Sequence, residues 1–246
     1  MIQSNIFNLN MRHLQPEKMD APDVDPKAHS EALEGLARVN HISRSAEAVW
    51  APLKDIVMKK ALSQPLRILD VASGGGDVAI QLKQISEKEG TPIVISGCDK
   101  SETAIRYARE KAASAQVTVD FFRHDIFQDA LPGSYDVITC NLFLHHLSEE
   151  ALLRWMKNLK TMQVHYVIAS DLNRSILGFL AAYIASRLLT RSPIVHFDAV
   201  QSVRNAFRVS EVKKLAEEAG WKQVRIRKMW PFHFQLIGKF NEFESA

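Results

Sequence analysis

Three consecutive glycines, Gly74–Gly76, stand between an apolar run that contains Asp70 and an amphipathic run that begins at Asp77. A strand, a glycine-rich turn and a helix in this order place free backbone N–H groups and a positive helix end beside a ligand. Glycine also lets a ligand approach the backbone closely. Residues 74–79 read G-x-G-x-x-A, a dinucleotide pattern that is weak by itself. The stretch therefore predicts a nucleotide-like ligand without identifying it.

Carboxylates at the ends of three expected strands narrow the choice of ligand. Asp70 lies just before the glycines, Asp99 ends the second apolar run and Asp125 ends the third. Three carboxylates around such a turn would repel a pyrophosphate, whereas they suit a cation that carries hydroxyls and an exocyclic amine. Turn or helix-capping chemistry is the structural alternative for Asp99 and Asp125. The pattern favours a sulfonium nucleoside over a dinucleotide.

Two histidines and an aspartate follow the next two expected strands. In open α/β sheets, ligands bind beyond the carboxyl ends of the strands, so His145, His146 and Asp171 are expected at the site. Histidine titrates near neutral pH and suits a general base. We favour His145, which comes first after the strand, while His146 could instead cap or pack at the next helix. Asp171 with Arg174 would orient a base or bind a polar substrate; a helix N-cap explains Asp171 equally well.

From Pro65 onward, short runs rich in Val and Ile alternate with helical patterns. The expected strands are Leu66–Ala72, Pro92–Asp99, Val117–Asp125, Tyr135–Phe143 and Val164–Asp171. The expected helices are Val78–Lys88, Ser101–Ala115 and Ser148–Met162, followed later by Ser210–Gly220. Strands that are apolar on both faces and alternate with helices indicate a parallel sheet covered on both sides. Lys222–Trp230 and His233–Phe240 read as a closing antiparallel pair around Pro231. The fold class is α/β, doubly wound.

Two regions depart from this alternation. Residues 1–25 show no period and are expected to form a partly ordered lead-in, and helices interrupted at Gly35 and Pro52 follow. We expect residues 1–62 to form an N-terminal helical lid and residues 63–246 a catalytic domain with a lid insertion at about 172–209. The apolar helix Ile176–Leu189 would roof an acceptor pocket; core packing, a dimer face or contact with a membrane surface are alternatives. Further candidates from the insertion, otherwise read as a surface loop, are His196, Asp198 and Arg204.

Composition limits the class of protein. The chain has 246 residues, 46% of them hydrophobic, and a formal net charge of +3. Its basic residues are scattered, so no nucleic-acid partner is expected. Cys98 and Cys140 lie in apolar runs and read as buried thiols, and no metal site is expected. No secretory signal is visible, and the longest uncharged stretch, Ser175–Ser186, is too short to span a membrane. We expect a cytoplasmic monomer or homodimer.

With these motifs in place, the sequence resembles the class I S-adenosylmethionine-dependent methyltransferases. "LDVASGGGD" resembles the first motif of that family and "YDVITCNLFLHHL" the fourth, and the closing strand pair resembles its antiparallel end. The resemblance covers Pro65 to Phe240. It implies a Rossmann-like sheet of seven strands in the order 3-2-1-4-5-7-6, with strand 7 antiparallel. Ala72 stands where the family has its first glycine, and its methyl group should fit if φ stays negative there.

The resemblance also implies S-adenosylmethionine as cofactor and a role for each matching residue. Asp70 and the backbone of the loop would hold the amino acid end of the cofactor; the loop residues are Ala72, Ser73, Gly74, Gly75 and Gly76. Asp99 would accept the ribose hydroxyls beside Lys100, and Asp125 the adenine amine beside Ile126. Asn141 would lie near the sulfonium. Arg44, from the helical lid, is a candidate partner for the cofactor carboxylate, although an exposed surface arginine is an equal alternative.

We therefore expect methyl transfer to an oxygen, or a carbon, of a small aromatic, polyketide-like or quinone-like acceptor. "NLFL" replaces the Asn/Asp-Pro-Pro-Tyr/Phe pattern of many enzymes that methylate nucleobase amines, which argues against that substrate class. An NAD(P)-dependent reductase is the first alternative, although a persuasive Tyr-x-x-x-Lys pair is lacking. A cofactor-binding protein without catalysis is the second alternative.

Overall fold

A single twisted sheet organises the chain. A computed structural model describes residues 9–21, 24–59, 64–128 and 131–241. Within them, seven strands pair in the order β3-β2-β1-β4-β5-β7-β6. The strands are β1 Leu66–Val71, β2 Ile93–Asp99, β3 Asp120–Arg123, β4 Val137–Asn141, β5 Tyr166–Leu172, β6 Gln223–Met229 and β7 His233–Lys239. Strand β7 runs antiparallel to both neighbours, and the other pairs are parallel. The predicted fold class and strand order are confirmed.

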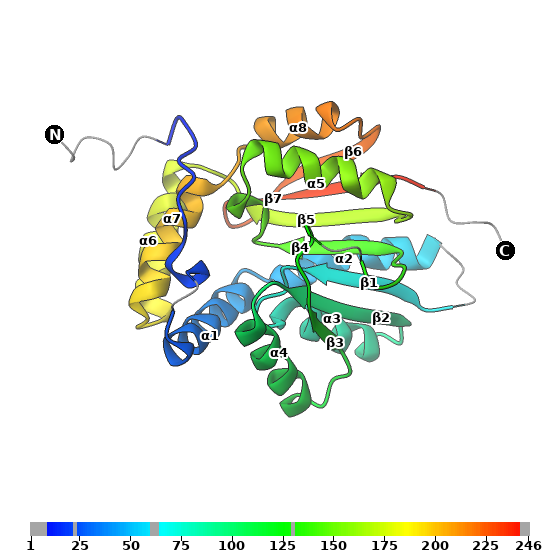
Figure 1. Cartoon of the computed structure of the whole chain (residues 1–246), viewed down its shortest axis with the longest axis horizontal. Coiled ribbons are helices and arrows are strands. Elements are labelled where there is room, and N and C mark those ends of the chain that lie inside the picture. The colour runs from blue at the N-terminus through cyan, green and yellow to red at the C-terminus, as the bar shows by residue number, and fades with distance from the viewer. Residues whose placement is uncertain (1–8, 22–23, 60–63, 129–130, 242–246) are drawn as a thin grey trace.

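Helices cover both faces of the sheet (Figure 1). One face packs against α5 (Glu149–Thr161) and α8 (Val209–Glu218), the other against α2 (Ser45–Lys59), α3 (Asp77–Lys88) and α4 (Glu102–Ser114). The central strands are buried on both sides because each face meets a helical layer; Ile68 and Leu69, neighbours on β1, belong to opposite core clusters. This burial explains why the strands read as continuous apolar runs.

A second group of helices lies beyond the carboxyl ends of the parallel strands. These are α1 (Pro26–Ile42), α6 (Ile176–Leu189) and α7 (Pro193–Asn205), grouped at the left of Figure 1. The expected interruptions at Gly35 and Pro52 are wrong, since α1 and α2 run through them. A Cβ at Gly35 would lie 3.0 Å from Oγ1 of Thr190, so the glycine allows close packing at the end of α6. Helix α2 packs on the sheet with α3, so only α1 of these two lies at the carboxyl edge.

The insertion after β5 is helical throughout. Helix α6 has the predicted bounds, but the expected surface loop after it is wrong, because residues 193–205 form α7. The side chain of Ser192 caps α7 and Pro193 occupies its first turn, a favourable helix start. Among the described residues, no helix is both long enough and apolar enough to cross a bilayer.

The N-terminal residues 9–21, here called the N-terminal strap, cross α7 and reach the ends of the central strands. Apart from the short 3-10 helix η2 (Lys18–Asp20), the strap is irregular, as its sequence predicts. Long-range hydrogen bonds nevertheless fix it. The Arg12 guanidinium donates to the carbonyl of His145 over 2.9 Å, and Asp198 on α7 accepts from the backbone N–H groups of Lys18 and Met19. The strap is thus part of the folded domain.

Candidate active site

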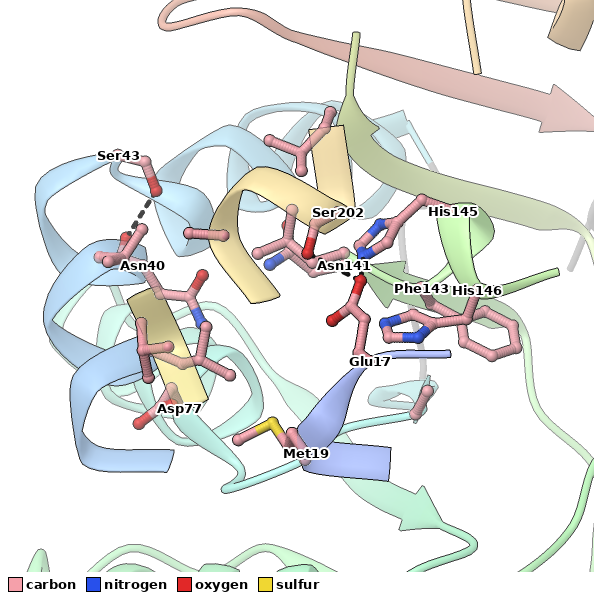
Figure 2. A pocket seen from close by; sticks show the side chains of 18 of the residues that line it. Glu17, Met19, Asn40, Ser43, Asp77, Asn141, Phe143, His145, His146 and Ser202 are labelled. Atoms are coloured by element: carbon pink, nitrogen blue, oxygen red, sulfur yellow. Dashed lines mark hydrogen bonds and ion pairs between the residues drawn. The ribbon is translucent and has the colours of Figure 1, made fainter. Parts of the chain in front are cut away.

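One cavity of about 570 Å³ opens at the carboxyl edge of the sheet. Its floor is made by the glycine loop and the ends of β2, β3 and β4, and its walls by the strap, α1, α6 and α7. Figure 2 shows Glu17, His145, His146 and Ser202 gathered at one part of this cavity, with Asn40, Ser43 and Asp77 at another. The topology therefore brings together groups that lie far apart in the sequence.

The glycine loop takes a backbone path that side chains would obstruct. Gly74 has φ of +51° and Gly76 φ of +75°, both in the left-handed region. A Cβ at Gly76 would also lie 2.6 Å from Cζ of Phe121. The loop therefore requires glycine for its own backbone conformation and for its packing on Phe121 of β3, in addition to any need to admit a ligand.

The conformation of Ala72 differs from the expectation. Its φ is +53°, whereas the methyl group was expected to fit with a negative φ. Left-handed backbone brings Cβ close to the following carbonyl oxygen and costs about 1–2 kcal/mol in a residue other than glycine. The chain therefore carries local backbone strain at Ala72.

Replacing Ala72 with glycine should accordingly stabilise the protein. Relief of the left-handed strain, less the added entropy of the unfolded chain, gives an expected gain of about 0.5–1 kcal/mol in the free energy of unfolding. Urea denaturation of the ligand-free chain measures it. As a control, Ala113→Gly on the exposed side of α4 should lower stability by about 0.5–1 kcal/mol. A loss of stability in Ala72→Gly would contradict the strain.

The carboxylate of Asp99 supports the glycine loop from the end of β2. Its Oδ2 accepts from the N–H of Gly74 at 3.0 Å and its Oδ1 from the N–H of Ser101 at 2.9 Å. Burial raises the pKa of Asp99. Because each carboxylate oxygen has two lone pairs, Asp99 can still accept hydroxyls from the cavity that it lines. Both the turn alternative and the binding role predicted for Asp99 therefore suit its geometry.

Most of the predicted cofactor residues border the same cavity. These are Ala72, Ser73, Gly74, Asp99, Lys100, Asp125, Ile126 and Asn141. Asp125 also forms a local turn, since Oδ1 accepts from the N–H of Phe127 at 3.0 Å and Oδ2 from the side chain of Gln128 at 2.7 Å. The predicted ribose, adenine and sulfonium partners thus lie along the floor of the cavity.

Three predicted cofactor residues lie elsewhere. Arg44 is exposed and pairs with Glu47 at 3.3 Å, and Gly76 serves as the N-cap of α3. Asp70 is buried beneath the loop, where its Oδ1 accepts from the hydroxyl of Thr139 at 2.8 Å. Burial, with a contribution from Asp99, raises the pKa of Asp70 to about 7. None of the three is among the residues that line the cavity.

Unpaired polar atoms in the cavity wall fit a polar ligand. Within the described ranges, Oδ1 of Asn40, Oγ of Ser73 and Nε2 of His124 are buried without a hydrogen-bond partner, and all three residues line the cavity. Buried polar groups are rarely left unpaired in folded proteins. Ser73 belongs to the glycine loop, His124 donates its backbone N–H to the carbonyl of Asp99 over 3.0 Å, and Asn40 faces the cavity from α1. Polar groups of S-adenosylmethionine could pair with these atoms, so this donor and acceptor set fits the cofactor.

His145 lies between two carboxylates. Its Nδ1 is 2.6 Å from Oδ1 of Asp171 and its Nε2 is 3.4 Å from Oε1 of Glu17, and the side chains of all three are at most 6% exposed. Burial alone would lower the pKa of His145, but Asp171 and Glu17 outweigh it and raise the pKa to about 10. The pKa values of Asp171 and Glu17 are lowered in turn, because His145 outweighs the burial of each. Of the two roles predicted for Asp171, the geometry agrees with orienting a histidine, while Ser175 caps α6.

His146 has a carboxylate partner of its own. Its Nδ1 is 2.9 Å from Oδ2 of Asp20, at the end of the strap, and its side chain is 26% exposed. The two histidines belong to the 3-10 turn η3 (Leu144–His146), and their ring centroids are 4.3 Å apart with the planes inclined by 32°. Both rings line the cavity. The turn therefore presents two stacked imidazoles, each held by a carboxylate, to one space.

Arg174 and the candidates from the insertion hold the structure together. The buried guanidinium of Arg174 donates to the carbonyls of Leu9 and Ala206 and pairs with Glu211. Nε2 of His196 lies 2.8 Å from the carbonyl of Thr190, and Asp198 anchors the strap. Neither Asp171 nor Arg174 is among the residues that line the cavity, so a direct contact of either with a substrate stays a prediction.

Sequence reasoning missed several residues of this site. Glu17, Asp20 and Ser202 are the polar ones beside the two histidines, and Ser202 donates to Oε1 of Glu17 over 2.8 Å (Figure 2). The strap residues belong to a segment without periodicity, so no local pattern marked Glu17 or Asp20. Ser202 could have been found by recognising α7 from the Ser192-Pro193 start.

Comparisons with known proteins agree with this fold. A family model described as a methyltransferase domain matches residues 68–164. The ubiquinone biosynthesis O-methyltransferase of Thiobacillus denitrificans is 29% identical over 157 residues, which span 63% of this chain and 63% of that protein. The enzyme of the same name from Shewanella pealeana is 26% identical over 209 residues, 82% of this chain and 78% of that one. The match to the first relative thus spans less than two thirds of its length.

Solved structures show the same architecture. A putative O-methyltransferase from Nostoc punctiforme superposes with a TM-score of 0.62 at 16% identity, covering 94% of this chain and 64% of that one. Magnesium protoporphyrin IX methyltransferase from Synechocystis, with bound S-adenosylhomocysteine, gives 0.56 at 18% identity over 82% of this chain and 84% of that one. At such identities the likeness establishes the fold alone.

The strand order and the glycine loop agree with the Rossmann-like fold that the sequence predicted, and residues 68–164 match a methyltransferase domain. These findings support a class I S-adenosylmethionine-dependent methyltransferase, the class that the sequence motifs predicted. These matches are methyltransferases and do not support the nicotinamide-dependent reductase that the G-x-G-x-x-A pattern left open.

Proposed function

We propose that the protein transfers a methyl group from S-adenosylmethionine to an oxygen of a small aromatic acceptor of the phenol or quinol type. The observation that carries this proposal is the rim cluster, defined as Glu17, His145 and His146, at one part of an otherwise largely apolar cavity. A phenol loses its proton near pH 10, so its methylation at neutral pH needs a group that assists deprotonation. A methyltransferase of a readily ionised acceptor would not need such a cluster.

The cofactor is proposed to lie along the floor of the cavity, formed by the glycine loop, Asp99 and Asp125. Asp99 accepts the ribose hydroxyls, Asp125 the adenine amine, and the side chain of Asn141 lies near the sulfonium. When bound, the cofactor supplies a methyl carbon already activated for displacement by its sulfonium sulfur. The task of the protein is then to align the acceptor oxygen with that carbon at about 3 Å.

The remaining walls of the cavity favour an apolar acceptor. Helix α6 presents small and apolar residues to it, namely Gly178, Ala181, Ala182, Ala185 and Leu189. Val195 and Val203 of α7 add to this surface. An aromatic or quinone-like ring would lose little by leaving water here. The names of the curated relatives support oxygen over carbon as the acceptor atom.

Of the two histidines, His146 is the better placed to act as the general base. Both ring nitrogens of His145 face carboxylates, and its side chain is 3% exposed. Asp20 holds Nδ1 of His146, which leaves Nε2 of a ring that lines the cavity to take the acceptor proton. The sequence favoured His145 because it comes first after the strand; the geometry favours His146, with His145 as a fixed neighbour.

His146→Ala should lower kcat by about 100-fold or more while leaving the affinity for S-adenosylhomocysteine within about threefold. Turnover is measured with a panel of phenols and quinols, and affinity by calorimetry. His41→Ala, an exposed histidine on α1, is the matched control and should leave both unchanged. Normal turnover in His146→Ala would remove the base assignment.

The function itself is tested by calorimetry and by product analysis. S-adenosylhomocysteine should bind and NAD(P)H should not, and the methylated product of a phenol or quinol should carry its new methyl group on oxygen. Binding of the nicotinamide alone would overturn the proposal. Methyl groups found only on carbon would move it to carbon acceptors, and intact binding with no turnover on the whole panel would favour a protein without catalysis.

A further inference from the structure

The rim cluster has the composition of a metal site as well as that of a base. Glu17, His145 and His146 each offer one ligand atom, and these atoms lie within 4.8 Å of one another. Two of the three residues are buried and the third is half-buried. Two histidines with one glutamate form a set that binds zinc in catalytic sites, where a fourth position stays open to water or substrate.

The distances suit an ion placed between the side chains. Nε2 of His145 and Oε1 of Glu17 are 3.4 Å apart, long for a charged hydrogen bond. Ligand atoms about 2.0–2.1 Å from a tetrahedral zinc ion lie about 3.3–3.4 Å from each other. This pair therefore already has the required spacing, and a ligand atom of His146 lies within 4.8 Å of both partners.

Outer contacts around the cluster strengthen the assignment. Histidines that bind metals nearly always donate their second N–H to a carboxylate, a carbonyl or water, which fixes the ring. Here Nδ1 of His145 lies 2.6 Å from Asp171 and Nδ1 of His146 lies 2.9 Å from Asp20. Ser202 likewise donates to Glu17 over 2.8 Å. Every ligand of the cluster has an outer partner, and the two Nε2 atoms remain for an ion.

We propose that Glu17, His145 and His146 bind one divalent transition-metal ion, such as zinc, whose open position faces the acceptor pocket. This departs from the sequence-based expectation of no metal site. Binding of the ion stands on the geometry alone; its role in turnover rests on the proposed function. In that role His146 is a ligand instead of a base, the acceptor oxygen binds the ion, and its hydroxyl proton leaves to solvent.

The proposal is tested on the full chain, free of affinity tags and stripped with a chelator. Titration with Co²⁺ should saturate at one ion per chain, with the visible spectrum of four-coordinate cobalt, and Zn²⁺ should displace it. Glu17→Gln and His146→Ala should weaken binding by more than about 100-fold, and Asp20→Asn by about 10-fold or more.

Controls keep the test decisive. His41→Ala should bind cobalt as the unaltered chain does, and retained affinity for S-adenosylhomocysteine shows that each variant is folded. No saturable cobalt binding, or equal binding by Glu17→Gln and His146→Ala, would overturn the metal site. Equal methylation of a phenol by stripped and loaded chain would overturn the role in turnover and leave the proposed function intact. One bound cobalt ion without methylation of any phenol would leave the metal site intact and overturn the proposed function, and with it the role in turnover.

Discussion

Asp99→Asn should lose at least about 100-fold in affinity for S-adenosylhomocysteine. The carboxylate of Asp99 is the proposed acceptor of two ribose hydroxyls, and hydrogen bonds to a charged group contribute about 1.5–3 kcal/mol each. Asparagine turns one acceptor oxygen into a donor. That donor would face either the N–H of Gly74, which now donates to Oδ2 at 3.0 Å, or a ribose hydroxyl. Loss of either contact disturbs the loop and the ligand together.

Calorimetry measures this loss, and Lys100→Ala is the matched control. Lys100 follows Asp99 and also lines the cavity, but its side chain is 66% exposed and lies 4.0 Å from Asp20. An exposed ion pair contributes at most about 1 kcal/mol, so the control should change affinity less than about fivefold. If Asp99→Asn, shown to be folded by circular dichroism, bound the ligand within about threefold of the unaltered chain, the proposed ribose contact would be wrong.

The sheet could be predicted from sequence because its signals are local. Runs such as Val137–Cys140 are buried on both faces, and capping serines such as Ser101 and Ser148 mark the helices between strands. Even the main deviation has a local cause. Strand β3 begins at Asp120 instead of the expected Val117, because the N–H of Val117 still donates to the carbonyl of Ala112 in the turn that ends α4.

Of the acid–base residues of the site, those that follow strands could be predicted from the sequence and those of the N-terminal strap could not. His145, His146 and Asp171 follow strands, so the rule that ligands bind beyond strand ends located them. Glu17 and Asp20 lie in a segment with no period, and the partner of Glu17 on α7, Ser202, is 185 positions away in the chain. Contacts over such separations depend on how α7 and the strap pack together. Local sequence patterns do not carry that information, and neither do they reveal the positive φ of Ala72.

Asp70 should make the stability of the protein depend on pH in a particular direction. Burial raises its pKa from 3.8 to about 7 in the folded chain. Between these two values the folded chain binds more protons than the unfolded chain, so the free energy of unfolding falls as pH rises. The loss is complete above about pH 7. Across pH 5 to 8 it amounts to about 2–3 kcal/mol from this group, at about 1.4 kcal/mol per pH unit.

Asp70→Asn removes the ionisable group and keeps an acceptor oxygen for the hydroxyl of Thr139, which now donates to Asp70 over 2.8 Å. Relative to the unaltered chain, the variant should therefore gain about 2–3 kcal/mol in the free energy of unfolding as pH rises from 5 to 8. Urea denaturation at several pH values gives this difference, in which the other titrating groups cancel. Asp55→Asn, an exposed carboxylate on α2, should show no such trend. A constant difference between Asp70→Asn and the unaltered chain would mean that Asp70 is ionised in the folded protein throughout, and that the cleft beneath the glycine loop is wetter than its burial implies.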